Sequence, residues 1–87
     1  MEITGKIHAI QSEFEKGNFK SRNLIIKTDE QYPQYISVQF VQDKCNLLDK
    51  FEENQIVTIG INLRGREWTN AQGETVYFNT IQGWKIN

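Results

Sequence analysis

Hydrophobic and polar residues alternate along most of the chain, which is the pattern of β-strands that bury one face. The alternation predicts five strands, at residues 3–10, 19–28, 35–41, 55–68 and 75–86. It is strictest in the fourth segment, whose expected buried face consists of Val57, Ile59, Ile61 and Leu63. Gly5 interrupts the first segment and predicts a sharp bend or a bulge, as a small barrel needs where a strand turns a corner.

Only the stretch from Asp43 to Phe51 has helical character, with Leu47, Leu48 and Phe51 on one side and Asp43 as the expected N-terminal cap. Three strands, a short helix and a long two-stranded hairpin form the element order of the OB fold. We therefore predict an all-β protein, a five-stranded Greek-key barrel with one short helix between strands 3 and 4. An SH3-like barrel is the competing fold, but a helix at this position is less natural there.

The chain has 87 residues, which is enough for one domain, and we expect a single OB-fold domain over residues 1–87. Hydrophobic residues at 38% and charged residues at 24% are ordinary for a soluble globular protein. No apolar run is long enough to span a bilayer, so no membrane association is expected. The first residues lack the features of a secretory signal, which predicts a cytoplasmic protein.

Residues that could carry out catalysis are scarce. Cys45 is the one cysteine, so no internal disulfide can form, and it is expected to be a small hydrophobe half-packed under the helix rather than a reactive thiol. His8 falls on the solvent side of the first strand and has no second histidine with which to share a metal. With no nucleophile-base pair, Gly-rich phosphate loop or Cys/His cluster, we expect no enzymatic activity, catalytic residue, metal, cofactor or small-molecule substrate.

Charge is unevenly distributed. The net charge is −1, whereas nucleic-acid binders are usually basic. Residues 16–27 nevertheless contain only basic charges, and residues 43–53 carry four acids against two lysines. This segregation predicts one basic face and one acidic face.

One stretch has the spacing of a known motif. It reads Leu63-Arg64-Gly65-Arg66-Glu67-Trp68-Thr69-Asn70, followed by Gly73 and Tyr77. This resembles the fourth strand, hairpin turn and fifth strand of bacterial single-stranded DNA-binding proteins, which typically carry Leu-Arg-x-Arg-x-Trp, then Asp or Asn, Gly and Tyr. The whole chain is also similar to a small bacterial family without assigned function that shares the barrel and an ending like residues 83–86.

The resemblance implies an OB barrel that binds single-stranded DNA and assembles into homo-oligomers through its first strand. It also implies a stacking aromatic at Tyr35, and it places Val41 where a second aromatic would usually stand, which predicts weaker base stacking. Unlike the resembled proteins, this chain is expected to lack the flexible tail with an acidic tip that recruits partners, because it stops two residues after Lys85.

Single-strand binders need aromatic faces for unpaired bases and cations along the backbone. Strand parity places Arg64, Arg66 and Trp68 together on the face opposite the buried set, where they would form a track for phosphates and bases. The complete set of candidate nucleic-acid-binding residues is Phe19, Lys20, Arg22, Tyr35, Gln39, Arg64, Arg66, Trp68 and Tyr77.

Some residues allow two interpretations. Trp68 could instead pin the turn against Tyr77, and the two arginines could pair with Glu67, Glu74 or the acidic helix. Trp84 and Phe78 are expected in the core. Lys20 and Arg22 share the parity of the buried positions, so either the strand bulges near Ser21 or both side chains lie past the barrel rim.

The leading hypothesis is binding of single-stranded DNA, or RNA, without strong sequence preference. The strand would cross predicted strands 2 and 3 and the hairpin of strands 4 and 5, and the protein would be a homo-oligomer, either a dimer or a tetramer. The alternative is an OB-fold protein-protein interaction module that has lost nucleic-acid binding, which the near-neutral charge and Val41 favour.

Overall fold

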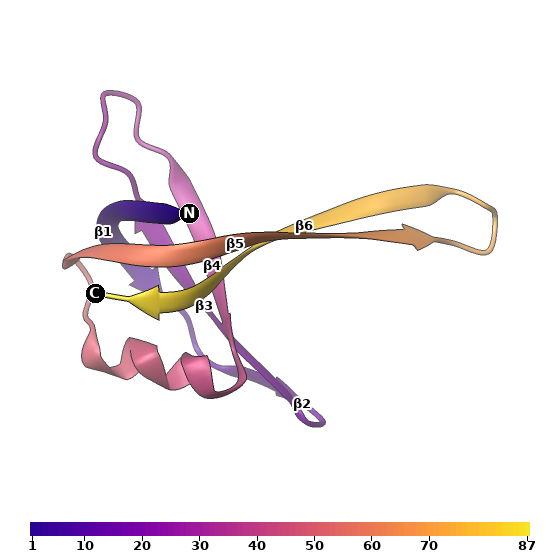
Figure 1. Cartoon of the computed structure of the whole chain (residues 1–87), viewed down its shortest axis with the longest axis horizontal. Helices are drawn as coiled ribbons and strands as arrows, with labels where there is room; N and C mark the ends of the chain where they lie inside the picture. Colours follow the sequence, from indigo (N-terminus) through magenta and orange to yellow (C-terminus); the bar gives the residue numbers. More distant parts are fainter.

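A computed structural model describes all of residues 1–87 and confirms the OB fold (Figure 1). Six strands and one 3-10 helix follow one another in the order β1 (Glu2–Ile10), β2 (Phe14–Lys16), β3 (Phe19–Lys27), β4 (Tyr35–Val41), η1 (Gln42–Lys50), β5 (Ile56–Thr69) and β6 (Thr75–Ile86). The predicted bounds of the third and fifth strands are those of β4 and β6.

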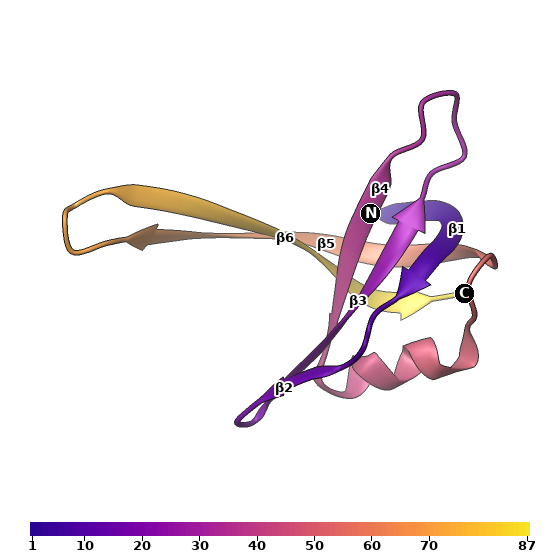
Figure 2. The ribbon, with the colours of Figure 1, turned by 180° about the vertical axis from the view of Figure 1, so that it is seen from behind.

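The strands form one sheet in the order β1-β5-β6-β4-β3-β2, and an additional pairing of β1 with β3 closes it into a ring. All neighbours are antiparallel except β4 and β6, which pair in parallel at Gln39 and Gln82. The helix η1 lies across one end of the ring, whereas the hairpin of β5 and β6 projects far beyond it (Figures 1 and 2). This projection gives the molecule extents of 45 × 34 × 20 Å.

The core confirms most of the predicted alternation. Its buried residues come from β1, β3, β4, β5 and the helix: Ile7, Leu24, Ile26, Val38, Phe40, Leu48, Val57, Ile59 and Ile61. From β6, the partly buried Ile81 and Ile86 pack against them. Leu63 was expected on the same buried face, but 64% of its surface is exposed. The prediction was wrong there because β5 leaves the barrel after Ile61.

Two glycines allow close packing. A Cβ on Gly5 would overlap the Ile26 side chain and lie 2.8 Å from the Lys27 carbonyl oxygen, so β1 can cross β3 only without a side chain there. The register shift of β1 lies between Ile7 and Ala9, rather than at Gly5 itself. Gly83 faces the ring of Phe40, where an added Cβ would lie 2.7 Å from Cε1.

Two local predictions need correction. The helix is capped at Val41 with no side-chain hydrogen bond, so Asp43 lies in the first turn and is not the cap. Between the first two predicted strands lies a short strand that the alternation did not predict, β2, which pairs with residues 19–21 of β3 through a turn at Gly17, where φ is +60°. None of the helical residues form a segment long and apolar enough to cross a membrane.

Candidate nucleic-acid interface

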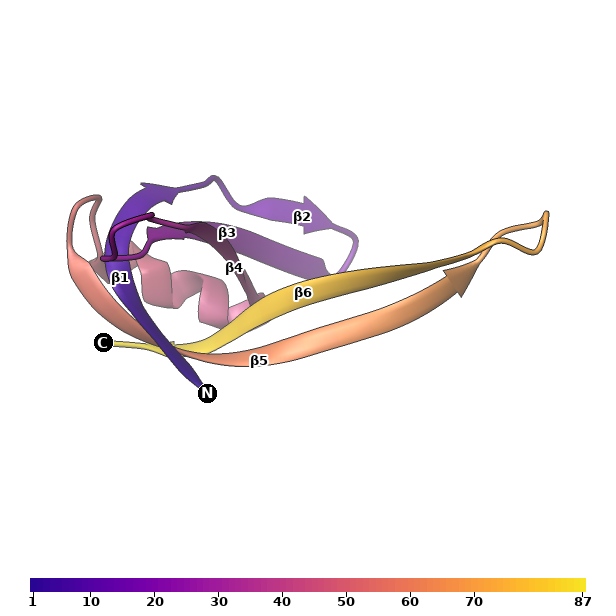
Figure 3. The ribbon, with the colours of Figure 1, turned by 90° about the horizontal axis from the view of Figure 1, so that it is seen from above.

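The outer part of the β5–β6 hairpin presents the two arginines of the motif on one face. Arg64 lies opposite Thr80, Arg66 opposite Phe78 and Trp68 opposite Val76. Opposed residues of an antiparallel pair share a face, so all six side chains lie on the same side of the hairpin. Seen from above, this hairpin extends well past β3 and β4 (Figure 3).

A groove of about 730 Å³ runs where this hairpin face meets the barrel. Four strands contribute its lining residues: Phe19, Gln39, Arg64, Arg66, Phe78, Asn79, Thr80 and Gln82. The structure therefore brings together four of the candidate residues, which are Phe19 of β3, Gln39 of β4, and Arg64 and Arg66 of β5.

The two groove arginines have no acidic partner. The ion pairs of the chain join Lys20 to Glu13, Arg22 to Asp49 and Lys85 to Glu2. Arg64 Nε donates to Gln82 Oε1 at 3.2 Å, and the Arg66 guanidinium carbon lies 5.7 Å from the centroid of the Phe78 ring. The groove thus holds two guanidinium charges that no carboxylate neutralises.

The expected acidic partners of these arginines are occupied elsewhere. Glu67 accepts a hydrogen bond from the Tyr77 hydroxyl at 3.4 Å, and Glu74 accepts one from the Asn70 side-chain amide at 3.3 Å. Tyr77 lies opposite Glu67, on the face of the hairpin that does not carry Trp68. The structure consequently does not bring Tyr77 together with the arginines, and Trp68 does not pin the turn against it.

Tyr35 stands at the start of β4, opposite Lys27 of β3. Its ring packs edge-on against His8, with ring centroids 4.9 Å apart, and Lys27 Nζ lies 5.9 Å from the Tyr35 centroid. Alternate residues of a strand share a face, so Tyr35 and Gln39 face the same side of β4. Tyr35 does not line the groove but lies further along the same outer surface.

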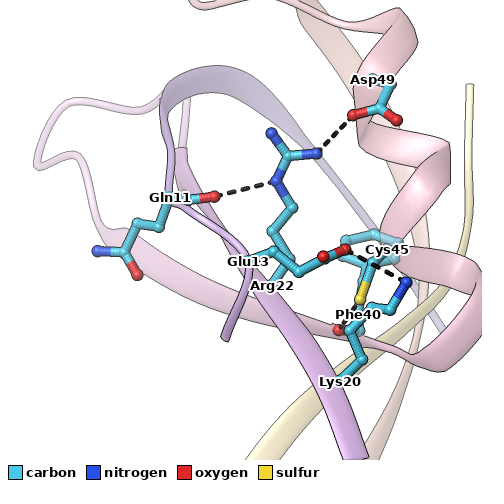
Figure 4. A network of polar contacts seen from close by, with 7 residues as sticks. All are labelled: Gln11, Glu13, Lys20, Arg22, Phe40, Cys45 and Asp49. Atoms are coloured by element: carbon cyan, nitrogen blue, oxygen red, sulfur yellow. Dashed lines mark hydrogen bonds and ion pairs between the residues drawn. The ribbon is translucent and has the colours of Figure 1, made fainter. Parts of the chain in front are cut away.

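Lys20 and Arg22 point toward the helix end of the barrel (Figure 4). Arg22 Nε donates to the Gln11 carbonyl oxygen at 3.0 Å, and its Nη1 lies 2.8 Å from Asp49 Oδ1. Lys20 Nζ lies 3.8 Å from Glu13 Oε1. The pairing of β3 is regular at both positions, with β2 at Lys20 and with β4 at Arg22, so the strand does not bulge. Neither side chain lines the groove.

Cys45 lies in the same region and is fully buried. Its thiol donates to the Phe40 carbonyl oxygen at 3.3 Å. Burial, with a smaller contribution from the negative charge of Glu13, raises the pKa of the Cys45 thiol, which keeps it protonated near neutral pH. No group of three or more His, Cys, Asp or Glu side chains could hold a metal ion.

Two aromatic residues of the outer surface were expected in the core. Phe78 is 49% exposed and lines the groove, and Trp84 is 42% exposed. Phe78 is exposed because the hairpin has left the barrel at that point. Counting residue pairs back along both strands from the hairpin turn places Phe78 opposite Arg66, so the sequence contained a signal for the outward position of Phe78. Trp84 lies at a register shift, which alternation does not reveal.

Comparisons with known proteins bear on the fold. A family model described as "Domain of unknown function (DUF3127)" matches residues 2–87. Among solved structures, the chain is similar to Rim1, a mitochondrial single-stranded DNA binding protein from S. cerevisiae, with a TM-score of 0.76 and 14% sequence identity. That similarity covers 100% of this chain and 90% of Rim1, and at such identity it shows a shared fold. No curated protein sequence matches.

Proposed function

This chain belongs to the DUF3127 family, and we propose that it binds single-stranded DNA, without strong sequence preference, along the groove and the adjoining hairpin face. The observation that carries the proposal is the pair of guanidiniums, Arg64 and Arg66, which lie among exposed aromatic rings without an acidic partner. Similarity to a single-stranded DNA binding protein over the whole chain supports it.

The groove offers both contacts that an unpaired strand needs. Guanidiniums bind phosphate oxygens through paired hydrogen bonds, and aromatic faces stack on bases of any sequence, each base contributing about 1–3 kcal/mol. Phe19 and Phe78 lie in the groove, and Trp68 continues the same face toward the hairpin tip. A strand would run from Trp68 past the arginines to Gln39, and onward to Tyr35.

Binding should weaken with salt, because each phosphate that is neutralised releases counterions from the strand. The slope of log affinity against log salt concentration is about −0.7 for each phosphate contact on a single strand. Two arginine contacts therefore correspond to a slope of about −1.4. The net charge of −1 adds no long-range attraction, so affinity rests on the groove itself.

The test is the anisotropy of labelled oligothymidine at low salt, with wild type and the double variant Arg66→Ala, Trp68→Ala. We expect wild type to bind and the double variant to lose at least tenfold in affinity while remaining folded, since a stacking face and a charge are removed together. Tyr77→Ala is the matched control, because this aromatic is 71% exposed on the opposite face of the same hairpin.

Two results would contradict the proposal. Micromolar wild-type protein that leaves the oligonucleotide tumbling freely at low salt would exclude binding. Equal losses in Tyr77→Ala and in the double variant would show that the strand does not lie on the arginine face.

We also propose that the protein is a homo-oligomer, a dimer or a tetramer. Residues 2–5 of β1 pair with β5 but not with β3, so one edge of this segment remains open for another strand. Sedimentation would give the mass of the assembly, and a monomer at micromolar concentration would contradict this proposal.

A protein-interaction module is the second candidate function. The observation in its favour is the opposite face of the hairpin, where Leu63 and Tyr77 are both largely exposed. A protein partner that remains bound after nuclease treatment, with no oligonucleotide binding, would select this function.

A further inference from the structure

A second hollow lies beside the groove, at the junction of β4, η1 and β6. Its volume is about 300 Å³, and its lining residues are Val41, Gln42, Asp43, Lys44, Gln82, Gly83 and Trp84. Gln82 lines both hollows. We propose that this pocket receives one unpaired base of the same single strand, stacked on Trp84. The inference rests on the proposed function and adds a stacking site beyond the hairpin.

A β-bulge gives Trp84 its outward direction. The pairing of β5 with β6 passes from Gly60–Lys85 to Ile61–Gly83, so Trp84 is the extra residue of β6. A bulge turns one side chain away from the alternation of its strand, and bulges are common beside binding sites. Here Gly83 and Ile61 stay on the core side, while the large indole is turned outward.

Gly60 and Lys85 both contact the indole of Trp84. A Cβ on Gly60 would lie 2.9 Å from Trp84 Cε2, so the ring rests directly on the backbone of β5. Lys85 Nζ lies 5.0 Å from the indole centroid and 3.3 Å from Glu2 Oε2. A fixed aromatic loses little conformational freedom when a base stacks on it, which favours binding.

The two hollows differ in the charge of their lining residues. The groove contains two arginines and no acid, which suits phosphates, whereas the pocket contains one acid, Asp43, and one base, Lys44. A neutral pocket with an indole and amide groups suits a nucleobase better than a phosphate. Because Gln82 Oε1 already accepts from Arg64, the Gln82 NH₂ group remains free to donate to a base edge.

Val41, the last residue of β4, lines this pocket together with Trp84. Trp84 is the one aromatic residue among the lining residues, so β6 provides the aromatic face of the pocket and β4 provides none.

The two tryptophans of the chain allow each site to be observed separately. Trp68→Phe leaves Trp84 as the sole fluorophore of its kind, and Trp84→Phe leaves Trp68. We expect saturation with oligothymidine of about 16 nucleotides to quench both emissions, and an oligomer of about 4 nucleotides, too short to reach both sites, to quench one more than the other.

Affinity gives a second measurement. Trp84→Ala should weaken binding of the longer oligonucleotide by about 5- to 150-fold, and Trp84→Phe should weaken it less because a ring remains. The matched control is Tyr32→Ala, which removes an exposed aromatic from the loop between β3 and β4, and should leave affinity unchanged.

Failure of this inference can be distinguished from failure of the proposed function. If Trp68 emission is quenched on binding but Trp84 emission is not, the inference is wrong and the proposed function stands. If wild type binds no oligonucleotide, both are wrong. Should Trp84→Ala fail to fold, the emission of Trp84 in Trp68→Phe, which keeps the native pocket, still decides.

Discussion

Arg22 allows a test of whether a basic residue of β3 serves stability or binding. The sequence suggested nucleic-acid binding, whereas in the structure its guanidinium joins the segment before β2 to the helix η1 (Figure 4). We expect Arg22→Ala to lower the free energy of unfolding and to leave oligonucleotide affinity unchanged within about twofold, because Arg22 does not line the groove.

The magnitude follows from the two contacts. A hydrogen bond from a charged donor to the Gln11 carbonyl contributes about 1.5 kcal/mol. The pair with Asp49 adds about 0.5 kcal/mol, since the Asp49 side chain is 65% exposed and solvent screens the charges. The total is about 2 kcal/mol, which corresponds to a fall in Tm of about 8–16 °C for a domain of this size.

Urea unfolding and oligonucleotide anisotropy, measured on the same preparations, provide the assay. Arg22→Lys is the matched variant, because it keeps the charge but cannot make both contacts at once. Its free energy of unfolding should fall by about half as much as that of Arg22→Ala, and its oligonucleotide affinity should not change. A stable Arg22→Ala variant whose affinity falls tenfold, with Arg22→Lys restoring it, would refute the structural role.

Three further outcomes concern stability. Gly83→Ala should cost about 1–3 kcal/mol because its Cβ meets the ring of Phe40, whereas Gly65→Ala in the exposed hairpin should cost less than about 0.5 kcal/mol in urea unfolding. Leu63→Glu should also stay within about 0.5 kcal/mol, and a larger loss would show that Leu63 is covered. Cys45 should react with a thiol reagent only upon unfolding. Reaction of the folded protein at the rate of a free thiol would contradict this burial. Because the pKa of the Cys45 thiol is raised in the folded state, the protonated thiol stabilises the fold fully below the unfolded pKa of about 8.5. Relative to Cys45→Ala, this stabilisation should be lost as pH rises through the higher folded pKa.

The fold could be predicted because burial on one face of a strand leaves a period of two in the sequence. The same rule fails at Leu63. Alternation identifies the two faces of a strand, but it does not show where the covering layer ends, and β5 continues past the barrel with its pattern intact.

The candidate site was predictable in part for a related reason. Parity places Arg64, Arg66 and Trp68 on one face within a single strand, but it does not give the register of the opposing strand. The turn at Asn70 sets that register, since Asn70 Oδ1 accepts from the backbone N–H groups of residues 72 and 74, and it puts Tyr77 on the other face.

Long-range contacts were beyond the reach of the sequence pattern. The partners of Lys20 and Arg22 come from the segment before β2 and from η1, which local spacing does not reveal. Trp84 was misplaced because a bulge shifts the alternation by one residue, and nothing in the local pattern marks that shift.

The projecting hairpin has a consequence for amide hydrogen exchange. Beyond Leu63 its two strands are hydrogen-bonded only to each other and have little buried surface, so this part can open while the barrel stays closed. Its amide protons should exchange much faster than those of the strand centres in the core. A strand bound across Arg66 and Trp68 would slow that exchange selectively, so a mass-resolved exchange map of the unmodified protein would record the footprint of its ligand.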